Sequence, residues 1–376
     1  FADDKEAWRN VEPDEGTWPP KISREVFEAY VREFGKDWVD SKTEGQLTTV
    51  RLKTYEEFKA LCEEPGKFLL LPGVESTLIQ NGLHIHMNYI NLPVLLPSIT
   101  GVDIVKTVED PQDPSALVAL NAAEVKQAAA QLNRPYLFML DHPYWIYWDV
   151  RPEVLLDCPD VRFFEIVNNG SKHAPHPEAL SYTPDKFWDI VNAFRSIRNQ
   201  PLLFGVASDD THYYDEKRCQ GEGGLADGWV MVRAQSLSPD ALLSAMHQGD
   251  FYATTGVQLD EVSFSPKSKT LRLKVKQEPG VDYRIDFITT KEGFNQQMRE
   301  VKSEPVRQIP LYSEEIGRTV KTVTGTEASY QLQPGDLYVR ARVESTRSCQ
   351  IDPYFHPKFQ TAWTQPFTTR KAAGIP

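Results

Sequence analysis

The stretch "NAAEVKQAAAQLNRPYLFMLDHP" (residues 121–143) contains the helix-to-strand transition on which our fold prediction depends. Residues 121–133 are typical of a helix, and the short apolar strand that follows closes on Asp141 and His142. Comparable strands occur elsewhere, with further helical segments between them; the strands are residues 67–75, 83–92, 161–169 and 200–210. Strands separated by helices of about 10–15 residues predict βαβ units, and hence a largely parallel sheet or barrel.

The pattern changes after residue 257. Segments such as "LRLKVKQEP" (271–279) and "DYRIDFITT" (282–290) alternate polar and apolar residues, and few helical signals accompany them. Such alternation is typical of an antiparallel β-sandwich. We therefore predict two domains, residues 1–256 and residues 257–376, with helix and loop over the first 60 residues.

Composition narrows the class of protein. The chain has 376 residues, of which 40% are hydrophobic and 25% charged, as in ordinary soluble domains. A net charge of −12 argues against a nucleic-acid-binding protein, because that affinity comes from clustered Lys and Arg. The chain has no apolar run of about 18 residues, so the sequence predicts no membrane-spanning helix. The four cysteines contain no CxxC pair, which excludes a zinc finger and leaves one or two disulfides open.

Acidic and histidine side chains recur at the predicted strand ends of the first domain. The carboxyl ends of barrel strands meet at one face, so residues far apart in sequence converge there. Imidazole nitrogens combined with carboxylate oxygens suit zinc, manganese or iron. A lone histidine at a strand end is more often a polar cap, but several strand ends of this kind favour a metal site. The side chains are Glu75, His84, His86, Asp141, His142, Glu165, Asp210 and His212.

Five segments in order carry a resemblance to a known family: "GVE" (73–75), "HIHMNYINL" (84–92), "DHP" (141–143), "SDDTHYY" (208–214) and "GDFYATTG" (249–256). They resemble the PHP (polymerase and histidinol phosphatase) family, and more closely its stand-alone metal-dependent phosphoesterase-like members. The similarity covers about residues 67–256. It implies a distorted (β/α)7 barrel with two or three divalent metal ions (Zn, Mn or Fe) at the carboxyl face of the strands, followed by the β-sandwich-like domain.

The resemblance also implies a ligand set. Glu75 would be the carboxylate that bridges two ions, and His86 and His142 would each bind a metal ion. Asp210 and His212 would form the last D-x-H ligand pair.

Other residues receive less direct roles. His84 shares a strand face with His86 and is a candidate proton donor, with simple packing as the alternative. Arg233 in "GWVMVRA" (228–234) is a candidate phosphate contact, with a structural salt bridge as the alternative. Asp141 and Asp209 could orient ligand imidazoles. Glu165 and Asn168 match a subgroup pattern only.

The chain departs from the family at its start. Members open with an H-x-H on the first strand and an aspartate–histidine pair on the second, and neither is present here. The first strand, first helix and second strand of the expected barrel are therefore missing. The chain would be a fragment, one half of a split protein completed by a separate N-terminal peptide, or a degenerate barrel with a lost or reduced metal site.

The function implied is metal-dependent hydrolysis of a phosphoester. The acidic composition favours a small organic phosphate over long nucleic acid. The alternative, from another class, is a non-catalytic structural or binding protein on a degenerate PHP scaffold. The resemblance to secreted members of the subgroup implies export to the periplasm or the cell exterior. No signal peptide is recognisable at Phe1.

Overall fold

The computed structural model describes residues 7–11, 22–80, 83–97, 99, 114–144, 150–168, 183–211, 227–303, 307–349 and 358–370. The chain divides into two compact units. The first comprises Phe1–Pro72 with Asp215–Lys217, and the second comprises Gly73–Tyr214 with Arg218–Pro376. The boundary that we predicted at residues 256/257 lies inside the second unit.

The first unit combines two helices with a small antiparallel sheet. Helix α1 (Arg24–Phe34) starts at the N-cap Ser23, and α2 (Tyr55–Cys62) starts at a capping box formed by Thr54 and Glu57. Both helices start within the first 60 residues, where we predicted helix and loop. The sheet has the order β1-β3-β2 and was not predicted; its strands are Trp8–Val11 (β1), Ser41–Glu44 (β2) and Leu47–Arg51 (β3).

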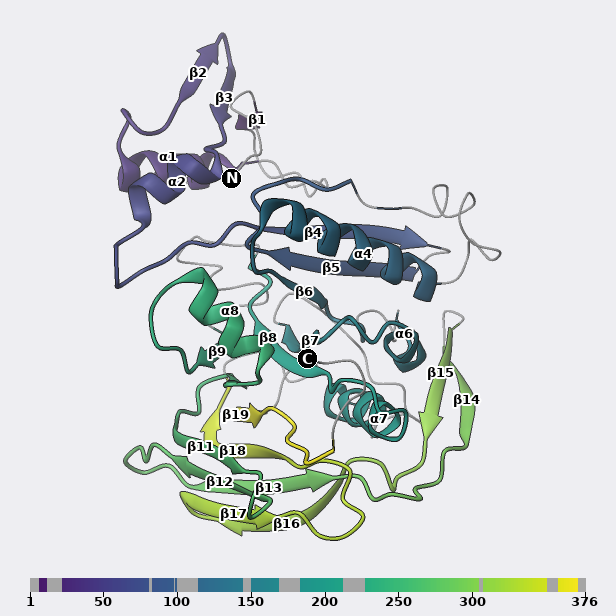
Figure 1. Cartoon of the computed structure of the whole chain (residues 1–376). Helices are drawn as coiled ribbons and strands as arrows, with labels where there is room; N and C mark the ends of the chain where they lie inside the picture. The colour runs from purple at the N-terminus through teal and green to yellow at the C-terminus, as the bar shows by residue number, and fades with distance from the viewer. Residues whose placement is uncertain are drawn as a thin grey trace. The chain divides into compact units, whose positions relative to one another are not determined.

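The second unit begins with a five-stranded sheet in the order β4-β5-β6-β7-β8. Strand β5 runs antiparallel to both of its neighbours, whereas β6, β7 and β8 are mutually parallel (Figure 1). The sheet is therefore mixed. The strands are Gly73–Gln80 (β4), Leu83–Ile90 (β5), Leu137–Leu140 (β6), Phe163–Asn168 (β7) and Phe204–Ser208 (β8).

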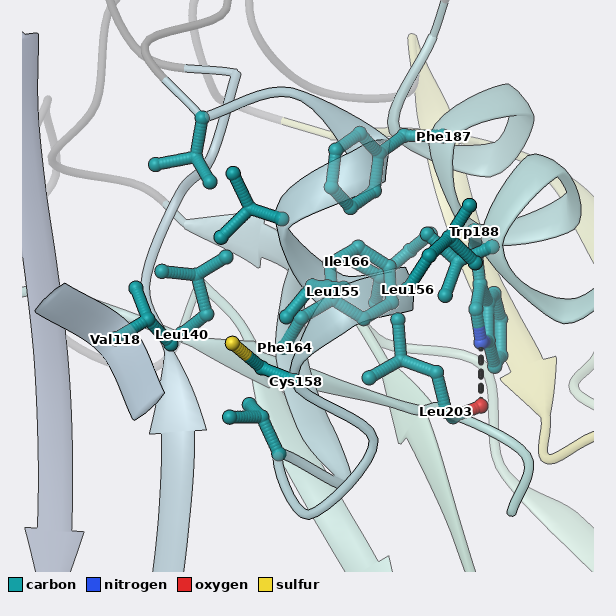
Figure 2. Packing of buried hydrophobic residues seen from close by; sticks show 14 of the residues in the cluster. Val118, Leu140, Leu155, Leu156, Cys158, Phe164, Ile166, Phe187, Trp188 and Leu203 are labelled. Carbon is teal, nitrogen blue, oxygen red and sulfur yellow. Dashed lines mark hydrogen bonds between the residues drawn. The ribbon is translucent and has the colours of Figure 1, made fainter. Parts of the chain in front are cut away.

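Helices α4 (Pro114–Leu132), α6 (Pro152–Asp157) and α7 (Pro184–Ile197) share one hydrophobic core with one face of this sheet. Figure 2 shows Trp188 of α7 packed in that core with its indole nitrogen directed at the carbonyl of Leu203, at 2.8 Å. The opposite face packs Phe163 and Phe204 against α8 (Pro239–His247). Strands β6, β7 and β8 are thus covered on both faces, as expected for strands that are apolar on both sides.

The other described elements of the second unit are β-strands. A six-stranded sheet has the order β16-β13-β18-β19-β10-β9, and a three-stranded sheet has the order β11-β12-β17. The two sheets bury one common apolar cluster, as in a sandwich. A separate hairpin, β14–β15, pairs only with itself among the described residues. The strands are Trp229–Val232 (β9), Phe251–Thr254 (β10), Leu259–Ser265 (β11), Thr270–Val275 (β12), Tyr283–Thr289 (β13), Met298–Ser303 (β14), Arg307–Tyr312 (β15), Arg318–Thr324 (β16), Glu327–Gln331 (β17), Arg340–Ser348 (β18) and Phe359–Thr364 (β19).

A buried ion-pair network joins α7 to strand β18. The Arg340 guanidinium is fully buried and donates from Nε to Asp189 Oδ1 at 2.9 Å and from Nη2 to Asp189 Oδ2 at 2.6 Å. Arg340 Nη1 lies 2.8 Å from Asp185 Oδ1, and the Tyr338 hydroxyl donates to Asp189 Oδ1 at 2.8 Å. These contacts link the helix-covered sheet to the β-sandwich.

The prediction of a (β/α)7 barrel is wrong. The described residues are rich in strand, at 39% strand and 24% helix, and their strands form several separate sheets. Strands β4 and β5 form an antiparallel pair, so no βαβ unit joins them. The segments "GWVMVRA" and "GDFYATTG" supply β9 and β10, which pair antiparallel and belong to the six-stranded sheet. Apolar periodicity predicts a strand but does not identify its partner, which explains the error.

None of the described helices is long and apolar enough to cross a membrane. Cys62, Cys158 and Cys349 are free thiols, and Cys219 lies outside the described residues.

Candidate metal site

The site depends on the β4–β5 pair, in which successive side chains point to alternate faces of the sheet. In β5, Ile85, Met87 and Tyr89 are buried in the core beneath α4, and the register places Thr77 opposite His86 and Glu75 opposite Asn88. Successive strand residues point to opposite faces, so Glu75, His84, His86 and Asn88 share the other face. The apolar half of the pattern fixes this register, because a slip by one residue would bury the histidines.

Three side chains converge on this face. Donor atoms of Glu75, His86 and His142 all lie within 4.8 Å of one another. Glu75 Oε1 is 2.7 Å from His86 Nδ1, and the ring centroids of His86 and His142 are 4.8 Å apart at an interplanar angle of 71°. Glu75 is exposed, His86 is half-buried and His142 is buried, so the group opens from the core toward the surface. One carboxylate and two imidazoles form a donor set that suits zinc and related ions.

The loop after β6 brings His142 to this group. The backbone N–H of Asp141 donates to the His86 carbonyl at 3.0 Å, which extends the β5–β6 ladder by one residue. The backbone N–H of His142 then donates to Glu165 Oε2 at 2.8 Å. Burial, together with the nearby His86 ring, lowers the pKa of His142 to about 3. The imidazole is therefore neutral near pH 7, the form that binds metal ions.

Glu165 supports the site from β7. It is buried and accepts hydrogen bonds from the His142 backbone, from Asn168 Nδ2 at 2.7 Å and from the Ser208 hydroxyl. Burial raises the pKa of Glu165 and these hydrogen bonds lower it in part. Because it holds the His142 backbone, Glu165 fixes the position of the loop that carries this imidazole.

Asp141 contrasts with Glu165. Its side chain is 3% exposed, and neither carboxylate oxygen receives a hydrogen bond of acceptable geometry from a described residue. Burial, together with the charges of Glu165, Glu75 and Asp210, raises its pKa well above the ordinary value, and the Asn88 amide lowers it only in part. The region around Asp141 is thus rich in negative charge, which favours a bound cation.

The other predicted residues are placed as follows. His84 lies beside His86, with ring centroids 6.1 Å apart, and is half-buried. Asp210 directly follows β8 at φ 48° and lies close enough to influence Asp141 and Glu165. His212 lies outside the described residues. Asp209 Oδ1 accepts the backbone N–H groups of residues 227 and 228, both at 2.8 Å, so it ties two loops together.

Arg233 pairs with residues outside this group. Its Nη2 is 2.6 Å from Asp250 Oδ1, and its Nη1 donates to the Val262 carbonyl at 2.9 Å. These are the contacts of a structural ion pair, the alternative considered above. A role for Arg233 in phosphate binding stays a prediction.

The sequence analysis did not predict two residues that contact the carboxylates near the site. Ser208 donates to Glu165, and Asn88 faces Asp141. Asn88 could have been found, because it continues the i, i+2 series of His84 and His86 along one strand face. Ser208 ends a buried strand, and nothing in its local pattern distinguishes it from an ordinary strand-end residue.

Comparisons of the chain with protein-family models, with curated proteins and with solved structures found no match.

The donor set passes the chemical test for a divalent cation. The three donor atoms lie within 4.8 Å of one another, so bonds of about 2.0–2.2 Å to one ion would draw the side chains closer together. The hydrogen bond from the His142 backbone to Glu165 restrains the loop in the way that outer residues orient metal ligands. Glu75, His86 and His142 therefore form a candidate metal site; which metal binds is unknown.

Proposed function

We propose that the protein is a metal-dependent hydrolase that acts on a small organic phosphate. The observation that carries the proposal is the convergence of Glu75, His86 and His142 on one face of the sheet. The resemblance of the surrounding segments to PHP phosphoesterases supports the choice of a phosphoester. The net charge of −12 supports a small substrate, because a long polyanion would be repelled.

The residues have distinct tasks in this proposal. Glu75, His86 and His142 hold the ion, and Glu165 keeps the His142 loop in place. A divalent ion bound there supplies a Lewis acid that polarises a phosphoryl oxygen and lowers the pKa of water.

His84 is the proposed proton donor to the leaving-group oxygen. It shares the face of His86 and is only half-buried, so a substrate at the site can reach it. A positioned general acid of this kind contributes about 10²–10⁴-fold to a rate.

The test is phosphate release by the full chain after chelation and reloading with Zn²⁺ or Mn²⁺. The substrates are p-nitrophenyl phosphate and a panel of sugar phosphates. We expect activity that depends on the added metal, a loss of kcat of at least about 10²-fold in His84→Asn with little change in KM, and no activity in His142→Ala. Metal binding without any phosphate release would instead support the non-catalytic alternative.

A further inference from the structure

Strand β4 brings Thr77 to the face of the sheet that carries the candidate metal site. The register pairs Thr77 with His86, between the pair that contains Glu75 and the pair that contains His84. The two neighbours of Thr77 along the strand are buried on the opposite face, which fixes the direction of the Thr77 side chain. The sequence analysis did not select this residue.

Strand geometry places Thr77 beside the group that would hold the ion. Side chains that face each other across an antiparallel pair have Cβ atoms about 4.5–5.5 Å apart, so the Thr77 and His86 side chains are direct neighbours. Successive residues on one face of a strand lie about 6.8 Å apart along it. A molecule that extends from the Glu75–His86 pair to the His84 imidazole therefore passes Thr77.

The Thr77 hydroxyl is available to a ligand. Thr77 is exposed, and no hydrogen bond joins its hydroxyl to another residue in the part of the chain that the structure describes. Other polar side chains of this face are engaged, because Glu75 contacts His86 and the Asn88 amide faces Asp141. The β-branched side chain also has few rotamers, which limits the directions that the hydroxyl can take.

A hydroxyl suits the charge of this site. The carboxylates of Glu75, Asp141 and Glu165 lie around it, and carboxylates accept hydrogen bonds and repel phosphoryl oxygens. Arg233, the arginine considered for phosphate binding, pairs with Asp250 instead. A neutral hydroxyl can donate to a phosphoryl oxygen without adding to the negative charge.

We propose that Thr77 is a substrate-contacting residue of the candidate metal site, whose hydroxyl donates a hydrogen bond to a non-bridging oxygen of the phosphoryl group. The inference rests on the proposed function and adds to it a residue that recognises the phosphoryl group. The product, inorganic phosphate, carries the same oxygens and makes the same contact.

The test is calorimetric titration of the zinc-loaded full chain with inorganic phosphate. Thr77→Val removes the hydroxyl but keeps the β-branched shape, so we expect phosphate affinity to fall about 10-fold or more, as for a lost hydrogen bond to a charged group. Thr77→Ser keeps a hydroxyl and should bind phosphate nearly as well as the wild type.

A matched control makes the same chemical change away from the site. Thr319 is an exposed residue of strand β16, and Thr319→Val should leave phosphate affinity unchanged. Zinc affinity, measured on the chelator-treated proteins, should be equal in the wild type and in all three variants.

The outcomes separate this inference from the proposed function. Equal phosphate affinity in the wild type and Thr77→Val, or an equal loss in Thr77→Val and Thr77→Ser, would overturn the contact and leave the proposed hydrolase intact. A zinc affinity that falls as much as the phosphate affinity in Thr77→Val would assign Thr77 to the metal site and also overturn the contact.

The proposed function can fail separately. Weaker phosphate binding by Thr77→Val, with no release of phosphate from any ester by the wild type, would support the contact and overturn the hydrolase. An absence of phosphate binding by the zinc-loaded wild type would overturn both.

Discussion

Replacing Asp189 with asparagine should destabilise the second unit more than any single change on its surface. Asp189 is buried in α7 and accepts two hydrogen bonds from Arg340 and one from Tyr338. Asparagine keeps nearly the same volume, so the substitution removes a charge without opening a cavity. The result is a guanidinium at 0% exposure that has lost its bidentate partner.

The expected loss follows from these contacts. Removing one partner of a buried ion pair costs about 3–5 kcal/mol, because the other charge is left uncompensated. Arg340 Nη1 keeps its contact with Asp185, and Tyr338 keeps the Thr290 hydroxyl at 3.0 Å. Because these two contacts remain, we expect the free energy of unfolding to fall by about 3 kcal/mol, the lower end of this range.

The assay is urea unfolding followed by tryptophan fluorescence, since Trp188 lies 4.7 Å from the Arg340 guanidinium. The control is Asp160→Asn, which breaks an exposed pair with Lys126 and should cost less than about 1 kcal/mol. The double variant Asp189→Leu/Arg340→Met should regain part of the lost stability but not all of it, because Asp185 then loses its contact with Arg340. A loss below about 1 kcal/mol in Asp189→Asn would refute the assignment of this network as a buried structural link.

Two further predictions concern single residues. Hydrogen bonds from Arg51 lower the pKa of Glu57 from 4.5 to about 2, so Glu57 contributes stability to the first unit that is present above pH 4.5 and is lost as the pH falls toward 2. Acid unfolding followed by circular dichroism should therefore lose this component in Arg51→Ala, and an unchanged acid profile would contradict the pairing. Gly317 adopts φ 70°, and an added Cβ would lie 2.4–2.8 Å from atoms of the Asp189 side chain. Gly317→Ala should thus cost at least about 1 kcal/mol in urea unfolding, whereas Gly293→Ala, also at a positive φ but with open space around it, should cost less.

The sequence predicts local structure well in this chain and pairing poorly. Ser23 and Thr54 are recognisable N-caps, and both helices begin there. The barrel prediction was wrong because the segment that connects two strands decides whether they pair parallel or antiparallel, and the prediction did not take those segments into account. Asn81-Gly82 separates β4 and β5 in the sequence, and this dipeptide is a strong hairpin signal that could have predicted the antiparallel pair. In the first unit, Gly45 at φ 62° marks the turn of another hairpin that the helical reading overlooked.

The candidate site was easier to predict than the fold. Glu75, His86 and His142 converge as expected, although they do so on a mixed sheet and Glu75 is the third residue of its strand. The i, i+2 spacing of His84 and His86 guarantees a shared face in any sheet, so this part of the prediction survives the change of fold. The difference between Asp141 and Glu165 is invisible in the sequence, because it depends on hydrogen-bond partners from three different segments.

The most direct test of the central claim is calorimetric titration of the chelator-treated full chain with Zn²⁺ at pH 7. We expect saturable binding by the wild-type protein and an affinity at least about 10²-fold weaker in His142→Ala, because a direct ligand matters at least as much as the residues that orient it. His247→Ala is the matched control, since His247 contacts the Tyr136 carbonyl at 2.7 Å and packs against Phe163, apart from the site. Equal zinc affinity in the wild type and His142→Ala, or no binding by either, would contradict the assignment of Glu75, His86 and His142 as a metal site.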